Sequence, residues 1–150
     1  AVYQTRALAR LVDFVSVGSN DLTQYLLAVD RNNPRVAHLY SAFHPAVLNA
    51  LYQVVSQAQE EGKPVSICGE MAGDPGAAVL LVAMGFDVLS MNAMTLLKVK
   101  SVIRSISLDA AQDLLDQVMQ MDDAQTIRSA VDLTLYNAGV DRLLRSSRTN

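Results

Sequence analysis

The sequence predicts an α/β fold that is built on a small parallel sheet. Three short apolar runs, 13–17, 65–68 and 88–91, have the length of strands, and a glycine or a polar residue follows each of them. Helical patterns separate the runs, and strands that are joined through helices pair in parallel with right-handed crossovers. Only helical patterns follow the third run. We therefore expect three βα units with additional C-terminal helices over residues 1–150.

The helices are predicted from their apolar spacing and their end signals. The first opens the chain, with Val2, Leu8, Leu11 and Val12 expected on its buried side. A second begins at Pro45, has one apolar face and ends at Gly62. Asp74 is the expected N-cap of a nearly all-apolar helix that ends at Gly85. Further helices are expected over 93–104, 108–121 and 123–138, followed by a frayed tail from 145 to 150.

The composition limits the classes of function. Hydrophobic residues make up 51% of the chain and charged residues 18%, against about 45–50% and about 25% in typical domains, so surface is expected to be covered by a partner or by further chain. A net charge of −3 without a basic stripe argues against nucleic acid as a partner. A lone cysteine excludes an internal disulfide framework and fits a reducing cytoplasm. No apolar stretch approaches the roughly 20 residues of a membrane span, and we expect no signal peptide.

Polar side chains follow each predicted strand where it ends. The carboxyl ends of parallel strands meet at one edge of a sheet, which is where parallel α/β folds place their chemistry. Carboxylate and amide oxygens suit a hard metal ion and an anionic ligand. Arg31 is near enough in sequence to return over this edge, and its guanidinium can grip a carboxylate or a phosphate with two donors. The candidate residues are Asn20, Asp21, Arg31, Cys68, Glu70 and Asn92.

Each of these residues also has a structural interpretation. From spacing alone, a helix cap is the simpler interpretation of Asn20 and Asp21. Cys68 can be a small buried hydrophobe, although the glycine that follows it argues for a turn with a role of its own. Asn92 is more simply a helix cap than a ligand. Ordinary loop charges remain the alternative for Arg31 and Glu70, and structural roles are the simplest for His38 and His44.

Two long motifs resemble a known family. Gly18-Ser19-Asn20-Asp21-Leu22-Thr23-Gln24-Tyr25 and Cys68-Gly69-Glu70-Met71-Ala72-Gly73-Asp74, together with Leu27-Ala28-Val29-Asp30-Arg31, resemble the C-terminal domain of phosphoenolpyruvate-protein phosphotransferase, enzyme I of the phosphotransferase system. The resemblance covers nearly the whole chain. Residues 31–33 and 68–75 are most similar to the nitrogen-related paralogue. Position 19 is Ser where enzyme I often has Thr, so the hydroxyl is kept.

The resemblance implies a fold and a set of roles. The chain would be the C-terminal βα units of a (β/α)8 TIM barrel, an incomplete barrel that binds phosphoenolpyruvate (PEP) and Mg²⁺ and forms a homodimer. Asp21 would be a metal ligand at the substrate, Asn20 would contact the phosphoryl group and Arg31 would bind the substrate. Cys68 would protonate the enolate to give pyruvate.

The resemblance also implies partners that this chain lacks. The phosphoryl group would pass to a histidine of a separate domain, not to His38 or His44, and then to a phosphocarrier protein of the HPr or NPr type, in sugar transport or nitrogen regulation. We expect the chain to be inactive alone. The alternatives are a non-catalytic binding or dimerisation fragment, or the C-terminal domain of pyruvate phosphate dikinase or PEP synthase.

Overall fold

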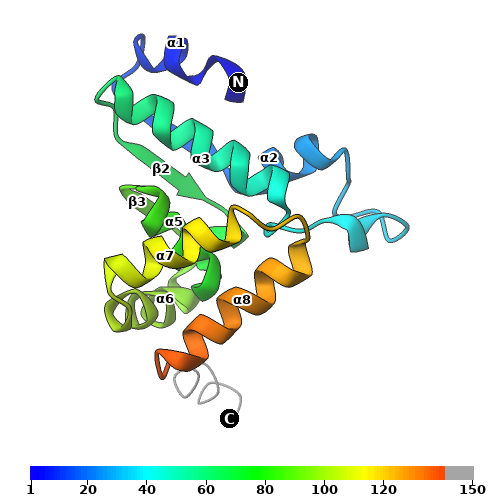
Figure 1. Cartoon of the computed structure of the whole chain (residues 1–150). Helices are drawn as coiled ribbons and strands as arrows, with labels where there is room; N and C mark the ends of the chain where they lie inside the picture. Colours follow the sequence, from blue (N-terminus) through cyan, green and yellow to red (C-terminus); the bar gives the residue numbers. More distant parts are fainter. Residues whose placement is uncertain (141–150) are drawn as a thin grey trace.

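The computed structural model describes residues 1–140 and contains a parallel three-stranded sheet with helices packed around it (Figure 1). The strands β1 (Val15–Gly18), β2 (Val65–Cys68) and β3 (Val88–Ser90) lie side by side in that order. Gly18 pairs with Cys68, and Cys68 pairs with Ser90. The three strand ends are therefore aligned at one edge of the sheet, as predicted. The expected tail from 145 to 150 lies outside the described residues.

Helices separate the strands and then continue alone. The chain opens with η1 (Val2–Gln4) and α1 (Thr5–Ala9). Between β1 and β2 lie α2 (Ser19–Leu27), η2 (Ala37–Leu39) and α3 (Pro45–Glu60). Between β2 and β3 lie the short α4 (Glu70–Gly73) and α5 (Pro75–Met84). After β3 come α6 (Ala93–Ser105), α7 (Leu108–Val118) and α8 (Ala124–Asn137), which confirms the predicted C-terminal helices.

Helix α5 is the centre of the C-terminal half. Leu80 and Leu81 are fully buried, and α5 contacts α4, α6, α7 and α8. A helix that is apolar all round needs cover on every side, which explains why three helices follow the last strand. A Cβ atom on Gly76 would lie 2.6 Å from Cγ1 of Val131 in α8, so the close approach of these two helices depends on this glycine.

The predicted buried side of the first helix is wrong at three of its four residues, whereas Val2 is partly buried against the core. Leu11 is 83% exposed and Leu8 is 44% exposed, and Val12 is exposed as well. Thr5 and Ala9 are buried instead, because α1 is a short helix that packs with this face against α3. The first strand also begins two residues later than predicted, at Val15.

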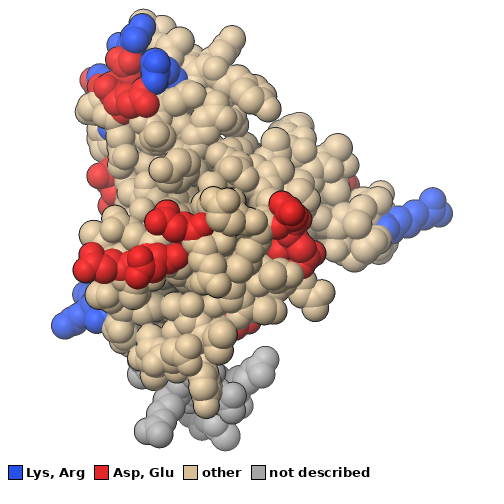
Figure 2. Space-filling view, in the orientation of Figure 1, with Lys and Arg blue, Asp and Glu red and all other residues tan. Residues whose placement is uncertain are grey.

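Charged side chains are unevenly distributed over the surface (Figure 2). Ion pairs of Arg6 with Glu60 and of Arg10 with Glu61 join α1 to the end of α3. Acidic side chains gather over α7, which carries the exposed Asp109, Asp113 and Asp116. Much of the face shown carries no charge. Within residues 1–140, no helix is long and apolar enough to cross a membrane.

Asp74 joins α5 to α8 through both of its carboxylate oxygens. Oδ1 accepts hydrogen bonds from the backbone N–H of Gly76 at 2.8 Å and of Ala77 at 2.9 Å. Asp74 is therefore the N-cap of α5, as the sequence predicted. Oδ2 accepts a hydrogen bond from Nη1 of Arg128 at 2.8 Å. The Arg128 guanidinium also lies 4.9 Å from the ring centroid of Phe43.

Substitutions of Asp74 should separate its two roles. Asp74→Ala removes both the cap and the ion pair, and we expect it to lower the free energy of unfolding by about 1–2 kcal/mol. Asp74→Asn keeps a good cap and loses only a partly exposed ion pair, which is worth about 0–1 kcal/mol. Urea denaturation at neutral pH measures both losses. Equal losses for the two variants would show that the ion pair, not the cap, is the dominant interaction.

Candidate functional site

A hollow lies at the aligned strand ends. It is lined by residues from the ends of all three strands and from the helices that follow them: Asn20, Cys68, Gly69, Glu70, Gly73, Ser90, Met91, Asn92 and Thr95. Four of the six candidate residues therefore line one surface. Arg31 approaches from the loop after α2, and Asp21 lies outside the lining.

The ends of β1 and β2 are held together by a buried hydroxyl. Oγ of Ser19 donates a hydrogen bond to the carbonyl of Cys68 at 2.9 Å, and Ser19 is 1% exposed. Oγ1 of Thr23 donates to the carbonyl of Ser19 at 2.8 Å. Gly69 follows with φ +114°, and a Cβ atom there would lie 2.4 Å from Oγ of Ser19. Glycine is thus required by both the backbone angle and the contact.

The helix-cap interpretation of Asn20 and Asp21 is wrong. The N-cap residue of α2 is Gly18, and no side chain caps this helix. Oδ1 of Asn20 instead accepts hydrogen bonds from the backbone N–H of Glu70 at 3.4 Å and from Oη of Tyr40 at 3.3 Å. Asn20 thereby connects α2 to the turn after β2 and to the loop before α3.

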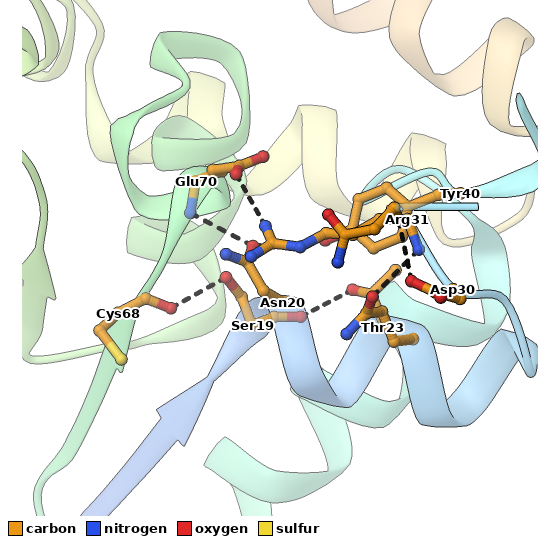
Figure 3. A network of polar contacts seen from close by, with 10 residues as sticks. Ser19, Asn20, Thr23, Asp30, Arg31, Tyr40, Cys68 and Glu70 are labelled. Atoms are coloured by element: carbon orange, nitrogen blue, oxygen red, sulfur yellow. Dashed lines mark hydrogen bonds and ion pairs between the residues drawn. The ribbon is translucent and has the colours of Figure 1, made fainter. Parts of the chain in front are cut away.

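The loop after α2 brings Arg31 back over the strand ends (Figure 3). Ala28 ends α2 at φ +54°, and this left-handed turn redirects the chain. The backbone N–H of Arg31 donates to Oε1 of Gln24 at 3.0 Å. Nη1 of Arg31 lies 2.7 Å from Oε1 of Glu70 and forms an ion pair with it. Arg31 and Glu70 are therefore paired with each other, which argues against their interpretation as ordinary loop charges.

Cys68 and Asn92 lie on other parts of the hollow. Cys68 is exposed, which excludes the buried-hydrophobe interpretation, and its sulfur points away from the ion pair of Arg31 with Glu70 (Figure 3). Asn92 caps α6 by accepting a hydrogen bond from the N–H of Met94 at 2.8 Å, as its structural interpretation predicted. His44 caps α3 through Nδ1.

Asp21 faces a different hollow. It lies in the first turn of α2 and lines an apolar groove together with Leu22 and Tyr25. In residues 1–140, no three His, Cys, Asp or Glu side chains come together as a metal cluster. Magnesium commonly takes only one or two protein carboxylates, with water and phosphate oxygens completing its shell. A single carboxylate such as Asp21 would therefore need water or ligand oxygens beside it to hold such an ion.

Sequence reasoning missed Tyr40. This residue lies 20 positions from Asn20, in a loop without a periodic pattern, and only the return of that loop brings the two together. Burial raises the pKa of the Tyr40 phenol above its ordinary value, while a hydrogen bond with Thr23 opposes the shift. The phenol therefore stays protonated and remains a hydrogen-bond donor well above neutral pH.

Comparison with known proteins gives the class to which this domain belongs. Residues 1–108 match the family described as PEP-utilising enzyme, PEP-binding domain. The chain therefore belongs to this family. It is 42% identical to the phosphoenolpyruvate-dependent phosphotransferase system protein of Salmonella typhimurium. The 144 aligned residues are 96% of this chain and 19% of the relative. The corresponding protein of Escherichia coli is 41% identical over the same shares of both chains.

A third relative carries the enzyme name that the motifs indicated. The phosphoenolpyruvate-protein phosphotransferase of Haemophilus influenzae is 42% identical over 132 residues, which are 88% of this chain and 23% of the relative. The chain thus spans about a fifth of the length of these curated relatives. The comparisons confirm the resemblance that the motifs predicted.

Substitution of Gly69 should disturb the junction of the two strand ends. Gly69→Ala places a methyl group against Oγ of Ser19 at a backbone angle that alanine rarely adopts. Gly62→Ala is the matched control, because Gly62 has φ +67° but a methyl group added there would meet nothing within 4 Å. The control should cost about 1–2 kcal/mol of unfolding free energy for the backbone angle alone. We expect a clearly larger loss for Gly69→Ala in urea denaturation, because its backbone (φ +114°, ψ −172°) lies in a region essentially confined to glycine and because the methyl group meets Ser19. Equal losses would contradict both causes.

Proposed function

We propose that this chain supplies part of a PEP site for phosphoryl transfer from PEP to a histidine elsewhere in the same protein, and from there to a phosphocarrier protein. The observation that carries the proposal is the convergence of Asn20, Cys68 and the Arg31–Glu70 ion pair on one strand edge in a chain of the PEP-binding family. The names of the relatives support the same reaction class. In this proposal the described sheet is part of a (β/α)8 barrel.

Substrate binding would use Arg31 and Asn20. PEP carries a carboxylate and a phosphoryl group, and a guanidinium binds such groups with two parallel donors. Arg31 is already held beside the hollow by Glu70. Asn20 lines the hollow directly, and its amide would donate to the phosphoryl oxygens. Neutral and cationic donors on these oxygens favour transfer, because the transition state spreads negative charge over them.

Cys68 would complete the reaction. Transfer breaks the bond between phosphorus and the enolate oxygen, and the phosphoryl group leaves on the histidine nitrogen. The enolate of pyruvate remains and needs a proton at its terminal carbon. The thiol of Cys68 lies exposed at the strand edge and would donate that proton, after which the thiolate recovers a proton from water.

Mg²⁺ and a second copy of the protein are further parts of the proposal. Asp21 would hold the magnesium ion, which supplies charge neutralisation at the phosphoryl and enolate oxygens when it is bound. Although Asp21 lines the neighbouring groove, its Oδ2 also lies near the end of β1, 3.8 Å from where a Cβ atom on Gly18 would be. Homodimerisation is supported by large apolar side chains that are exposed within residues 1–140, among them Tyr3, Tyr25, Met94 and Leu97. Exposed apolar surface of this kind marks contacts with further chain or with a partner.

Arg31→Lys in the full-length protein should lower kcat/KM for PEP by at least tenfold. Lysine keeps the charge but loses the planar pair of donors. Arg35→Lys is the matched control, because Arg35 lies exposed in the same loop and should leave the kinetics unchanged. A coupled pyruvate assay measures both variants, with thermal melting to confirm folding. Unchanged kinetics for Arg31→Lys would remove Arg31 from the proposed site.

Cys68→Ala in the full-length protein should slow pyruvate release by more than a hundredfold, with little change in substrate affinity, because the thiol acts after phosphoryl transfer. General acid catalysis is typically worth about 10²–10⁴ in rate. Cys68→Ser should also be slow, since a hydroxyl is a much weaker acid than a thiol. Deuterium incorporation from heavy water into pyruvate reports the step. Pyruvate formation by Cys68→Ala at the parent rate would contradict the assigned role.

A further inference from the structure

The Asn20 carboxamide is held from three directions. Its Oδ1 accepts hydrogen bonds from the N–H of Glu70 and from Oη of Tyr40. The backbone of Gly69 packs against it so closely that a Cβ atom there would lie 3.3 Å from this Oδ1. Figure 3 shows Asn20 at the meeting point of these elements. The N–H of Glu70 can only donate, so the atom that faces it must be the amide oxygen.

This arrangement determines what Asn20 can offer to a ligand. An amide oxygen has two lone pairs, and both are used by the two donors. The two N–H bonds of Nδ2 remain, and no acceptor within residues 1–140 is hydrogen bonded to them. Asn20 therefore presents only donors to the hollow that it lines. Donors attract phosphoryl oxygens, whereas a rotated amide would present its oxygen and repel them.

We propose that Tyr40 is a positioning residue that holds the Asn20 amide with its donors toward the phosphoryl group of the substrate. This inference rests on the proposed function, because it needs Asn20 to contact that group. Tyr40 does not touch the substrate in this assignment. It acts through the oxygen of Asn20 and thereby excludes the rotated amide.

The position of Tyr40 also couples this orientation to the placement of Arg31. Tyr40 follows η2 in the loop that carries Arg31, and three residues later Phe43 is buried in the core beside Arg128. The loop is thus anchored just after Tyr40. When the loop occupies the described position, the phenol reaches Asn20 and the guanidinium reaches Glu70 together. A phenol is a donor throughout the neutral range, and burial raises the pKa of Tyr40 further.

The test is a double-mutant cycle in the full-length protein. Tyr40→Phe keeps the ring and removes the hydroxyl, and Asn20→Ala removes the amide. A hydrogen bond of this kind is worth about a five- to tenfold change, so Tyr40→Phe should lower kcat/KM for PEP by about five- to tenfold. Tyr52→Phe, on α3 and half exposed, is the matched control and should leave kcat/KM unchanged. Thermal melting verifies that all variants fold.

The decisive measurement is the effect of Tyr40→Phe when Asn20 is already absent. We expect Tyr40→Phe to cause no further loss in the Asn20→Ala background. Where turnover is too slow to measure, the same cycle is built from binding. Calorimetry then gives the dissociation constant of phosphoglycolate, a non-reacting phosphorylated carboxylate, for the parent, the two single variants and the double variant.

The outcomes separate this inference from the proposed function. Asn20→Ala with parental kinetics and phosphoglycolate binding would overturn the role of Asn20 itself, and the positioning role with it. A harmful Asn20→Ala together with a silent Tyr40→Phe would overturn only the positioning role. The same holds if Tyr40→Phe causes an undiminished loss in the Asn20→Ala background, because the tyrosine would then act independently of the amide.

Discussion

The hydrogen bond from the Ser19 hydroxyl to the Cys68 carbonyl is the contact on which the site depends. It joins the end of β1 to the end of β2 beyond the last backbone pair of the ladder. Gly69 packs directly against the same hydroxyl, so the first turn of α2 and the turn after β2 form one rigid unit. Only within this unit can the N–H of Glu70 reach the side chain of Asn20. A buried hydroxyl without this partner would cost about 1–3 kcal/mol.

The loop between α2 and α3 depends on this unit at one end and on the core at the other. It leaves α2 through the left-handed turn at Ala28 and re-enters the fold at the buried Phe43. Arg128 of α8 lies against that ring and also holds Asp74 at the start of α5. The C-terminal helices therefore do more than cover α5, because they support the segment that carries Arg31 and Tyr40.

The sequence predicted the architecture well because its signals were local. Apolar runs identified the three strands, and the N-caps Asp74 and Asn92 were recognisable from the helices that they precede. The buried side of α1 was predicted wrongly, since spacing alone does not reveal which neighbour a short helix has. The helix-cap interpretation of Asn20 was wrong because its side chain instead accepts a hydrogen bond from the backbone N–H of Glu70, fifty residues away in the sequence. Tyr40 could not be predicted at all, since only the tertiary path of its loop brings it to the site.

The charge balance at the hollow bears on how the proposed site would accept an anion. No cation lines the hollow itself within the described residues, and Arg31 is engaged with Glu70. Only Nη1 of Arg31 donates to Glu70, so an anionic ligand that takes Nη1 as one of two parallel donors would displace Glu70 from it. The Glu70 side chain is 75% exposed, and a pair this exposed is worth about 0–1 kcal/mol, so the exchange costs little. The pair nevertheless keeps the guanidinium within reach of the strand ends. The pair carries no net positive charge, so the charge that the dianionic phosphoryl group of the proposed substrate requires would have to come from a metal ion or from groups other than those that line the hollow in residues 1–140.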